Sequence, residues 1–120
     1  MRAILPVIAL CAFTVAAFAA SEQELMATRY GNTLIIHDSL GTNRVWYNPD
    51  HTFHAASWLG DVYGHWQIQN GQMCLYAEQY PALYRLKYSI PECDVIEPHK
   101  VGDKWQHSGR DYELVGGIVH

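Results

Sequence analysis

The sequence predicts an all-β fold, an antiparallel meander of about eight strands that forms a small barrel or a flattened sandwich. Short runs of β-branched and aromatic residues alternate with turn residues along most of the chain. The chain contains 4 Trp, 8 Tyr and 3 Phe, large side chains from which a core can be built. Because an open sheet of short strands would leave long unpaired edges, we expect the sheet to close or nearly close.

Residues 1–19 are predicted to be a cleaved signal peptide, followed by a single β domain over residues 20–120. Arg2 gives a positive start, an apolar run follows, and Ala17-Phe18-Ala19 has the small-x-small pattern that signal peptidase reads. The apolar run is short and rich in alanine for a membrane span, so no stable membrane anchor is expected after cleavage. An uncleaved anchor is the alternative. This prediction places the protein in the periplasm or outside the cell.

Charge and cysteine content restrict the partners further. The whole chain has a formal net charge of −4 and contains no basic cluster, which argues against binding to nucleic acid or to anionic lipid surfaces. Cleavage would remove Cys11 and leave Cys74 and Cys93. Two cysteines in an exported chain most simply form one disulfide bond. The alternatives are a buried unpaired thiol in the core and lipidation of Cys11.

The N-terminal half is predicted to contain one short helix and several strands. Ser21 is a candidate N-cap for a helix that ends by Thr28 and spans at most two turns. Strands are expected at 33–37, 44–47 and 52–58, with turns at 39–42, 48–51 and 59–61. We expect the strands between Arg44 and Ala77 to lie side by side in chain order.

The strongest turn signal is Asn70-Gly71, which favours a type I′ turn because both residues tolerate a positive φ. This turn pairs Gln69 with Gln72 and, further along, Trp66 with Leu75. One face of the predicted hairpin is apolar and belongs to the core: Trp66, Ile68, Met73, Leu75 and Ala77. The other face is mostly solvated: His65, Gln67, Gln69, Gln72, Cys74 and Tyr76.

The C-terminal half is predicted to continue the sheet. Residues 83–90 alternate, with Tyr84, Leu86 and Tyr88 on one side, and this period of two indicates a strand. Residues 93–96 are expected to be extended. A last hairpin is expected from 104–107 and 111–115 around the turn at Ser108-Gly109.

Histidines are frequent, seven in all, but their spacing favours no metal site and no cofactor is expected. The pair His51 and His54 would point to opposite faces of a strand. His54 and His65 are expected to lie nearly opposite each other on adjacent strands. Together with an acidic turn residue such as Asp61, they are the candidates for a small periplasmic enzyme.

The aromatic residues are more numerous than a core of this size requires. In a barrel, inward aromatic rings with a few polar groups form a pocket for an apolar or aromatic ligand. The candidate ligand-binding residues are His54, Trp58, His65, Gln67, Tyr84 and Arg85. The alternative is that the aromatic rings only fill the core and support the turns.

Several short motifs occur in order along the chain: Gly-Asn-Thr-Leu at 31–34, Tyr-x-x-Asp-x-Thr-Phe at 47–53, Gly-x-Trp…Asn-Gly-x-x-Cys at 64–74, Cys93, and Val-Gly-Asp-x-Trp at 101–105. In these motifs the chain resembles a group of small exported alphaproteobacterial proteins of unknown function. The resemblance implies an all-β periplasmic domain with a Cys74–Cys93 bridge and no assigned active site. His51 stands where glycine usually follows the turn aspartate in these proteins.

These observations predict an exported, non-catalytic binding or envelope-accessory module. The expected partner is an apolar small molecule or a protein of the cell envelope. The alternative function is the small enzyme that would use His54, His65 and an acidic turn residue.

Overall fold

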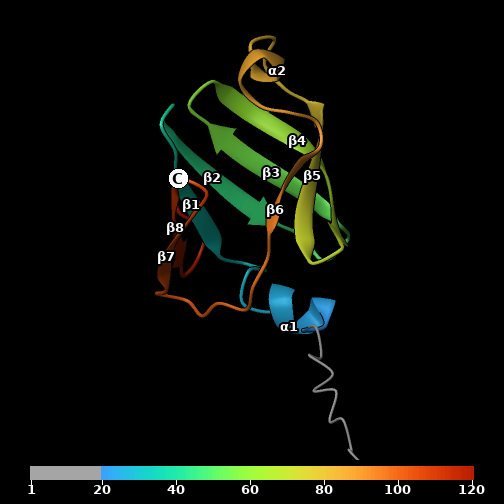
Figure 1. The fold of residues 1–120 in the computed structure, drawn as a ribbon, viewed down its shortest axis with the longest axis vertical. Helices are drawn as coiled ribbons and strands as arrows, with labels where there is room; N and C mark the ends of the chain where they lie inside the picture. The colour runs from blue at the N-terminus through green and yellow to red at the C-terminus, as the bar shows by residue number, and fades with distance from the viewer. Residues whose placement is uncertain (1–19) are drawn as a thin grey trace, which may run out of the picture.

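In the computed structural model, which describes residues 20–120, the chain forms one antiparallel sheet of eight strands that curls into a half-barrel (Figure 1). The all-β meander predicted from the sequence is therefore confirmed. The sheet order is β6-β5-β4-β3-β2-β1-β8-β7, so the first six strands lie in chain order and the last hairpin pairs with β1. The predicted signal peptide lies outside the described residues.

The elements along the chain are α1 Glu22–Met26, β1 Thr33–His37, β2 Thr42–Tyr47, β3 Thr52–Ser57, β4 Gly60–Gln69, β5 Gln72–Gln79, α2 Tyr84–Lys87, β6 Glu92–Val95, β7 Lys104–His107 and β8 Arg110–Val115. The two helices lie at opposite ends of the curled sheet, α1 at the lower end and α2 at the upper end of Figure 1. Neither they nor any other helix among the described residues has the length and apolar character needed to cross a membrane.

The hairpin of β4 and β5 forms as the sequence predicts. Asn70 and Gly71 have φ of 51° and 72°, and Gln69 pairs with Gln72 across them. Trp66 is fully buried on the core face of this hairpin, whereas Gln67 beside it is exposed. A one-residue slip would reverse these environments, so the turn and the apolar pattern specify the same register.

The strand expected at 83–90 is wrong, because this segment contains the short helix α2. Tyr84 and Tyr88 are four residues apart, lie on one side of a helical turn and stack with ring centroids 5.0 Å apart. Leu86, which the alternating pattern placed on the same side, is instead 75% exposed. The aromatic spacing, which continues from Tyr80 to Tyr84, outweighs the alternation of polar and apolar residues.

The lower end of the half-barrel is covered by α1. Ser21 caps this helix by accepting a hydrogen bond from the Glu24 amide, as expected, and Leu25 and Met26 are buried. The tight turn before β3 also forms, with His51 at φ 67° in the left-handed region. The His51 ring stacks on Trp66 at 3.9 Å, a contact that a glycine at this position would lack.

The predicted bridge between Cys74 and Cys93 is present. The two cysteines are direct partners in the ladder between β5 and β6. Because β6 is a four-residue edge strand, the disulfide anchors this edge of the sheet to the neighbouring strand β5.

Candidate functional site

A cavity of about 350 Å³ lies inside the curled sheet. Because side chains alternate along each strand, every second residue points into it. Its apolar wall includes Leu34, Ile36, Val45, Phe53, Ala55, Val62, Met73 and Leu75. Small-molecule pockets are typically concave and mostly apolar, with volumes from about 300 Å³ upward, and this cavity has those properties.

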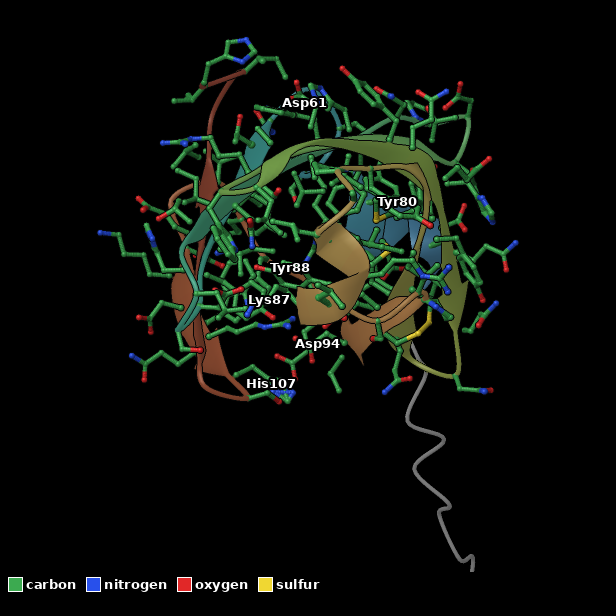
Figure 2. The ribbon with its side chains drawn as sticks, turned by 90° about the horizontal axis from the view of Figure 1, so that it is seen from above. Asp61, Tyr80, Lys87, Tyr88, Asp94 and His107 are labelled. Carbon is green, nitrogen blue, oxygen red and sulfur yellow. A yellow bond between two sulfur atoms is a disulfide. The ribbon has the colours of Figure 1, made fainter. Side chains whose placement is uncertain are left out.

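One side of the cavity is closed by side chains rather than by backbone pairing. No ladder joins β6 to β7 or β8 among the described strands, and Figure 2 shows Asp94 and His107 near each other at this gap. The Arg110 guanidinium donates to Glu92 at 2.8 Å, and the Tyr112 hydroxyl donates to Asp94. The His107 Nε2 atom lies 3.5 Å from Asp94. We call these five residues the seam.

In the seam, protonated donors on β8 face carboxylates on β6. Burial raises the pKa of Tyr112, and its hydrogen bond to Asp94 raises it further. Burial lowers the pKa of Arg110, but its hydrogen bond to Glu92 and its interaction with Tyr112 raise the pKa above the usual value overall. Both groups therefore remain protonated and serve as donors that hold the two edges of the sheet together.

The upper end of the cavity is covered by α2, which lies across the opening of the curled sheet in Figure 2. The Tyr88 hydroxyl fixes this segment by three hydrogen bonds. It donates to Asp38 at 3.0 Å and accepts from the Asn43 amide at 3.1 Å and from the Trp58 indole at 2.9 Å. We call α2 and the residues around it, 81–90, the lid.

Removing this hydroxyl is expected to loosen the lid. In Tyr88→Phe the three hydrogen bonds are lost, so amide exchange at Leu86 and at position 88 should accelerate by about tenfold, corresponding to about 1.4 kcal/mol. Hydrogen–deuterium exchange would measure this change. Tyr80→Phe is the matched control, because no hydrogen bond of the described residues involves the Tyr80 hydroxyl. Equal exchange in wild type and Tyr88→Phe would show that Tyr88 does not hold the lid.

Two buried residues extend the cavity towards α1. Arg29 is only 4% exposed and donates to the backbone carbonyls of Leu25 and Glu97, the latter at 3.0 Å. Tyr47 is 5% exposed, and its backbone forms a bridge with Tyr30, the residue after Arg29. Both side chains line the cavity, so its end near α1 is polar, as the seam is.

We expect the protein to lose stability at alkaline pH, because two tyrosines of the cavity have raised pKa values. Burial raises the pKa of Tyr47 and of Tyr84 to about 12, against 10.0 for an ordinary tyrosine. A raised pKa in the folded state means that the stabilisation is complete below pH 10 and is lost as the pH rises to about 12. Tyr47 ionises more easily in the unfolded chain than in the folded protein. We therefore expect the free energy of unfolding to fall by roughly 2 kcal/mol as the pH rises from 10 to about 12. Urea denaturation should show a flatter pH dependence in Tyr47→Phe; the same slope in both proteins would contradict the assignment.

The structure distributes the six predicted ligand-binding residues over different surfaces. Tyr84 lines the cavity, whereas Trp58 does not line it but donates a hydrogen bond to Tyr88, which does. Arg85 is exposed on α2. The other three, His54, His65 and Gln67, do not line the cavity and lie on the outer face of β3 and β4.

His54 and His65 lie on adjacent strands and on one face, as expected, but they are not directly opposite each other. The turn between β3 and β4 lies at Trp58 and Leu59, earlier than the sequence indicated, so His54 pairs with Tyr63 and His65 with Thr52. Each histidine instead contacts its own carboxylate: His54 lies 3.0 Å from Asp61 and His65 lies 2.7 Å from Glu78. The residues of the proposed enzyme are therefore divided between two separate outer-face pairs.

Several residues of the cavity carried no clear signal in the sequence. Arg29 follows a short helix without any motif around it, and Tyr88 was placed on a strand. The seam gives only a weak signal in the sequence. Glu92 and Asp94 lie two positions apart on β6, and Arg110 and Tyr112 lie two positions apart on β8, so each pair lies on one face of its strand. Recognising it requires knowing that these two strands face each other.

No group of three or more His, Cys, Asp or Glu side chains in residues 20–120 is placed to hold a metal ion. Comparison of the chain with protein-family models, with curated proteins and with solved structures found no match. The cavity and its two closures, the seam and the lid, are the features of the described residues that indicate a function.

Proposed function

We propose that this protein is a binding protein that holds an apolar or aromatic small molecule in the cavity of the half-barrel. The observation that carries the proposal is the cavity of about 350 Å³ with an apolar wall. Protein interiors are closely packed and contain few voids larger than a water molecule. An apolar space of this size in so small a domain is therefore better explained by a ligand than by imperfect packing.

The lid and the seam support a site that encloses its ligand. Tyr84 contributes to the cavity wall from α2, so movement of the lid would change both access and shape. On the opposite side, polar side chains close the seam without making the apolar wall polar. A ligand in this site would be shielded from water on most of its surface, which is the main source of affinity for apolar molecules.

We further propose that the protein acts in the periplasm or outside the cell. The Cys74–Cys93 disulfide supports this, because disulfide bonds persist mainly in oxidising compartments. Expression of the full chain followed by cell fractionation and mass spectrometry tests the localisation. The expected species is an oxidised chain without residues 1–19 in the periplasmic or extracellular fraction; an intact reduced chain in the cytoplasm would contradict it.

One observation favours the alternative function of a small enzyme. The Nε2 atom of His54 lies 3.0 Å from Asp61, a distance at which a carboxylate can orient an imidazole. This pair lies on the outer face, away from the cavity, and His65 is paired separately with Glu78. The binding function therefore has the stronger geometric support.

Binding of N-phenyl-1-naphthylamine, an uncharged apolar fluorophore, tests the proposed function. We expect saturable binding with increased fluorescence. Ala55→Leu should weaken it by about tenfold, because the added side chain enters the cavity. Ala56→Leu, on the outer face of the same strand, is the matched control and should bind as wild type does. Absence of saturable binding, or equal effects of the two substitutions, would contradict the proposal.

A further inference from the structure

The cavity contains a buried positive charge that has no carboxylate partner among the described residues. Arg29 is 96% removed from solvent, and its hydrogen bonds go to the neutral carbonyls of Leu25 and Glu97. The ion pairs of the described residues do not include it. Arg110, the other arginine of the cavity, differs because Glu92 neutralises it at 2.8 Å.

The Tyr47 hydroxyl lies in the same part of the cavity and is also available as a donor. None of the hydrogen bonds formed by residues 20–120 uses it, although the tyrosine is 95% buried. The electrostatic interaction with Tyr47 also opposes the lowering of the Arg29 pKa by burial, which is consistent with their proximity. The two side chains therefore present an uncompensated charge and an unused hydroxyl to one space.

Three of the acidic side chains that line the cavity, those of Asp38, Glu92 and Asp94, already accept hydrogen bonds from other side chains. Glu92 accepts from Arg110, and Asp94 accepts from Tyr112 beside His107. Asp38 accepts from Tyr88 at the lid, at the end of the cavity opposite α1. Glu97 contributes its backbone carbonyl to Arg29 rather than an ion pair. Arg29 is thus the charged group of the cavity end near α1 that has no ion pair within residues 20–120, whereas the Glu97 residue is exposed and the other three lining carboxylates are hydrogen-bonded.

A buried charge without a counter-ion is unfavourable because it has lost its hydration. Folding has already removed Arg29 from water, so an anion that binds there bears mainly the cost of its own desolvation. A charge-assisted hydrogen bond from the guanidinium, with a second from the tyrosine hydroxyl, compensates that cost. A carboxylate matches this pair because its two oxygens accept several hydrogen bonds.

We propose that the cavity selects amphipathic carboxylates, molecules with one apolar body and one carboxylate head, and that Arg29 and Tyr47 bind the head. The inference rests on the proposed function and specifies its ligand class. The apolar body lies between β1 and β5 against the wall that contains Val45 and Val62. The head lies at the α1 end, so the lid covers the distal part of the body.

Displacement of N-phenyl-1-naphthylamine by decanoate and by decan-1-ol tests this selectivity. The two probes have the same alkyl length and differ in the head group. We expect decanoate to displace the fluorophore from the wild-type protein at a concentration lower by about tenfold or more. Decyltrimethylammonium, a cation of the same chain length, should be the weakest of the three because Arg29 repels it.

Substitutions of Arg29 and Tyr47 test whether these two residues produce the preference for the carboxylate. Arg29→Met keeps the length of the side chain without its charge, and it should abolish the preference for decanoate over decan-1-ol. Arg29→Lys should retain the preference, and Tyr47→Phe should reduce it without abolishing it. The ratio between the two probes separates recognition of the head from loss of stability, since a general loosening weakens both probes alike.

The wild-type comparison is decisive even when a variant does not fold. Equal displacement by decanoate and decan-1-ol, or a preference for decan-1-ol, would overturn the inference and leave the apolar binding function standing. Retention of the decanoate preference in folded Arg29→Met would overturn it as well. If the fluorophore itself fails to bind, the proposed function fails, and this outcome is distinct from the other two.

Discussion

Gly64→Ala is expected to lower the free energy of unfolding by about 3 kcal/mol or more. Gly64 lies at a β-bulge in β4, where the register shifts and Gly64 pairs with Ala77. A Cβ atom at this position would lie 2.0 Å from the carbonyl oxygen of Tyr76 and 3.0 Å from the Cα atom of Ala77. These are backbone atoms of the neighbouring strand, so the steric overlap can be removed only if β4 and β5 move apart.

Urea denaturation of Gly64→Ala measures this effect, with Gly71→Ala as the matched control. Gly71 has a φ of 72° but no heavy atom within 4 Å of an added Cβ, so its substitution costs only the backbone strain, about 1 to 2 kcal/mol. We therefore expect Gly64→Ala to be clearly the more destabilising of the two. A Gly64→Ala protein as stable as wild type would show that the bulge does not bring the two strands into this close approach.

Cys93→Ser is expected to cost about 3 kcal/mol of stability under oxidising conditions. The disulfide closes a loop with a sequence separation of 19 residues, and its loss releases conformational entropy in the unfolded chain. The native state is affected as well, because the bridge holds edge strand β6, which supplies Glu92 and Asp94 to the seam. We expect the variant to bind N-phenyl-1-naphthylamine more weakly and to show faster amide exchange in β6.

The reduced wild-type protein is the control for this substitution. Reduction should lower the stability of the wild-type protein to that of Cys93→Ser, and should leave the variant itself unchanged. This comparison separates the bridge from the effect of placing a serine on β6. Equal melting temperatures for oxidised wild type and Cys93→Ser would refute a stabilising role for the bridge.

Local signals in the sequence predicted the centre of the fold correctly. Asn70-Gly71 specified the register of β4 and β5 because the turn type and the apolar alternation agree, and the pairing of Cys74 with Cys93 is compatible with that register. The lid was mispredicted because the segment 83–90 is short. Tyr84 and Tyr88 lie on the same side both in a strand, where the period is two, and in a helical turn, where residues four apart are neighbours. The rings of Tyr80, Tyr84 and Tyr88 contact one another at a spacing of four residues, and the hydrogen bonds of the Tyr88 hydroxyl to Asp38, Asn43 and Trp58 are the tertiary contacts of this segment.

The candidate site was less predictable than the fold because it depends on pairs distant in the sequence. The turn between β3 and β4 begins one residue earlier and ends two residues earlier than expected, so His65 lies opposite Thr52 rather than beside His54. The seam joins Glu92 to Arg110, and the polar end joins Arg29 to Glu97, contacts that follow only from the curl of the sheet. Of the six predicted ligand-binding residues, Tyr84 lies in the cavity wall because the lid folds over the opening, a feature that the sequence did not show.

NMR of methyl-labelled protein with bound N-phenyl-1-naphthylamine tests most directly whether the cavity is the binding site. A ligand inside the half-barrel should give intermolecular nuclear Overhauser effects to methyl groups of the cavity wall, at Leu34, Val45 and Val62. Contacts confined to the exposed methyl groups of Leu83 and Leu86 would place the molecule on the outer surface of the lid. That result would contradict the central claim that the cavity is the binding site.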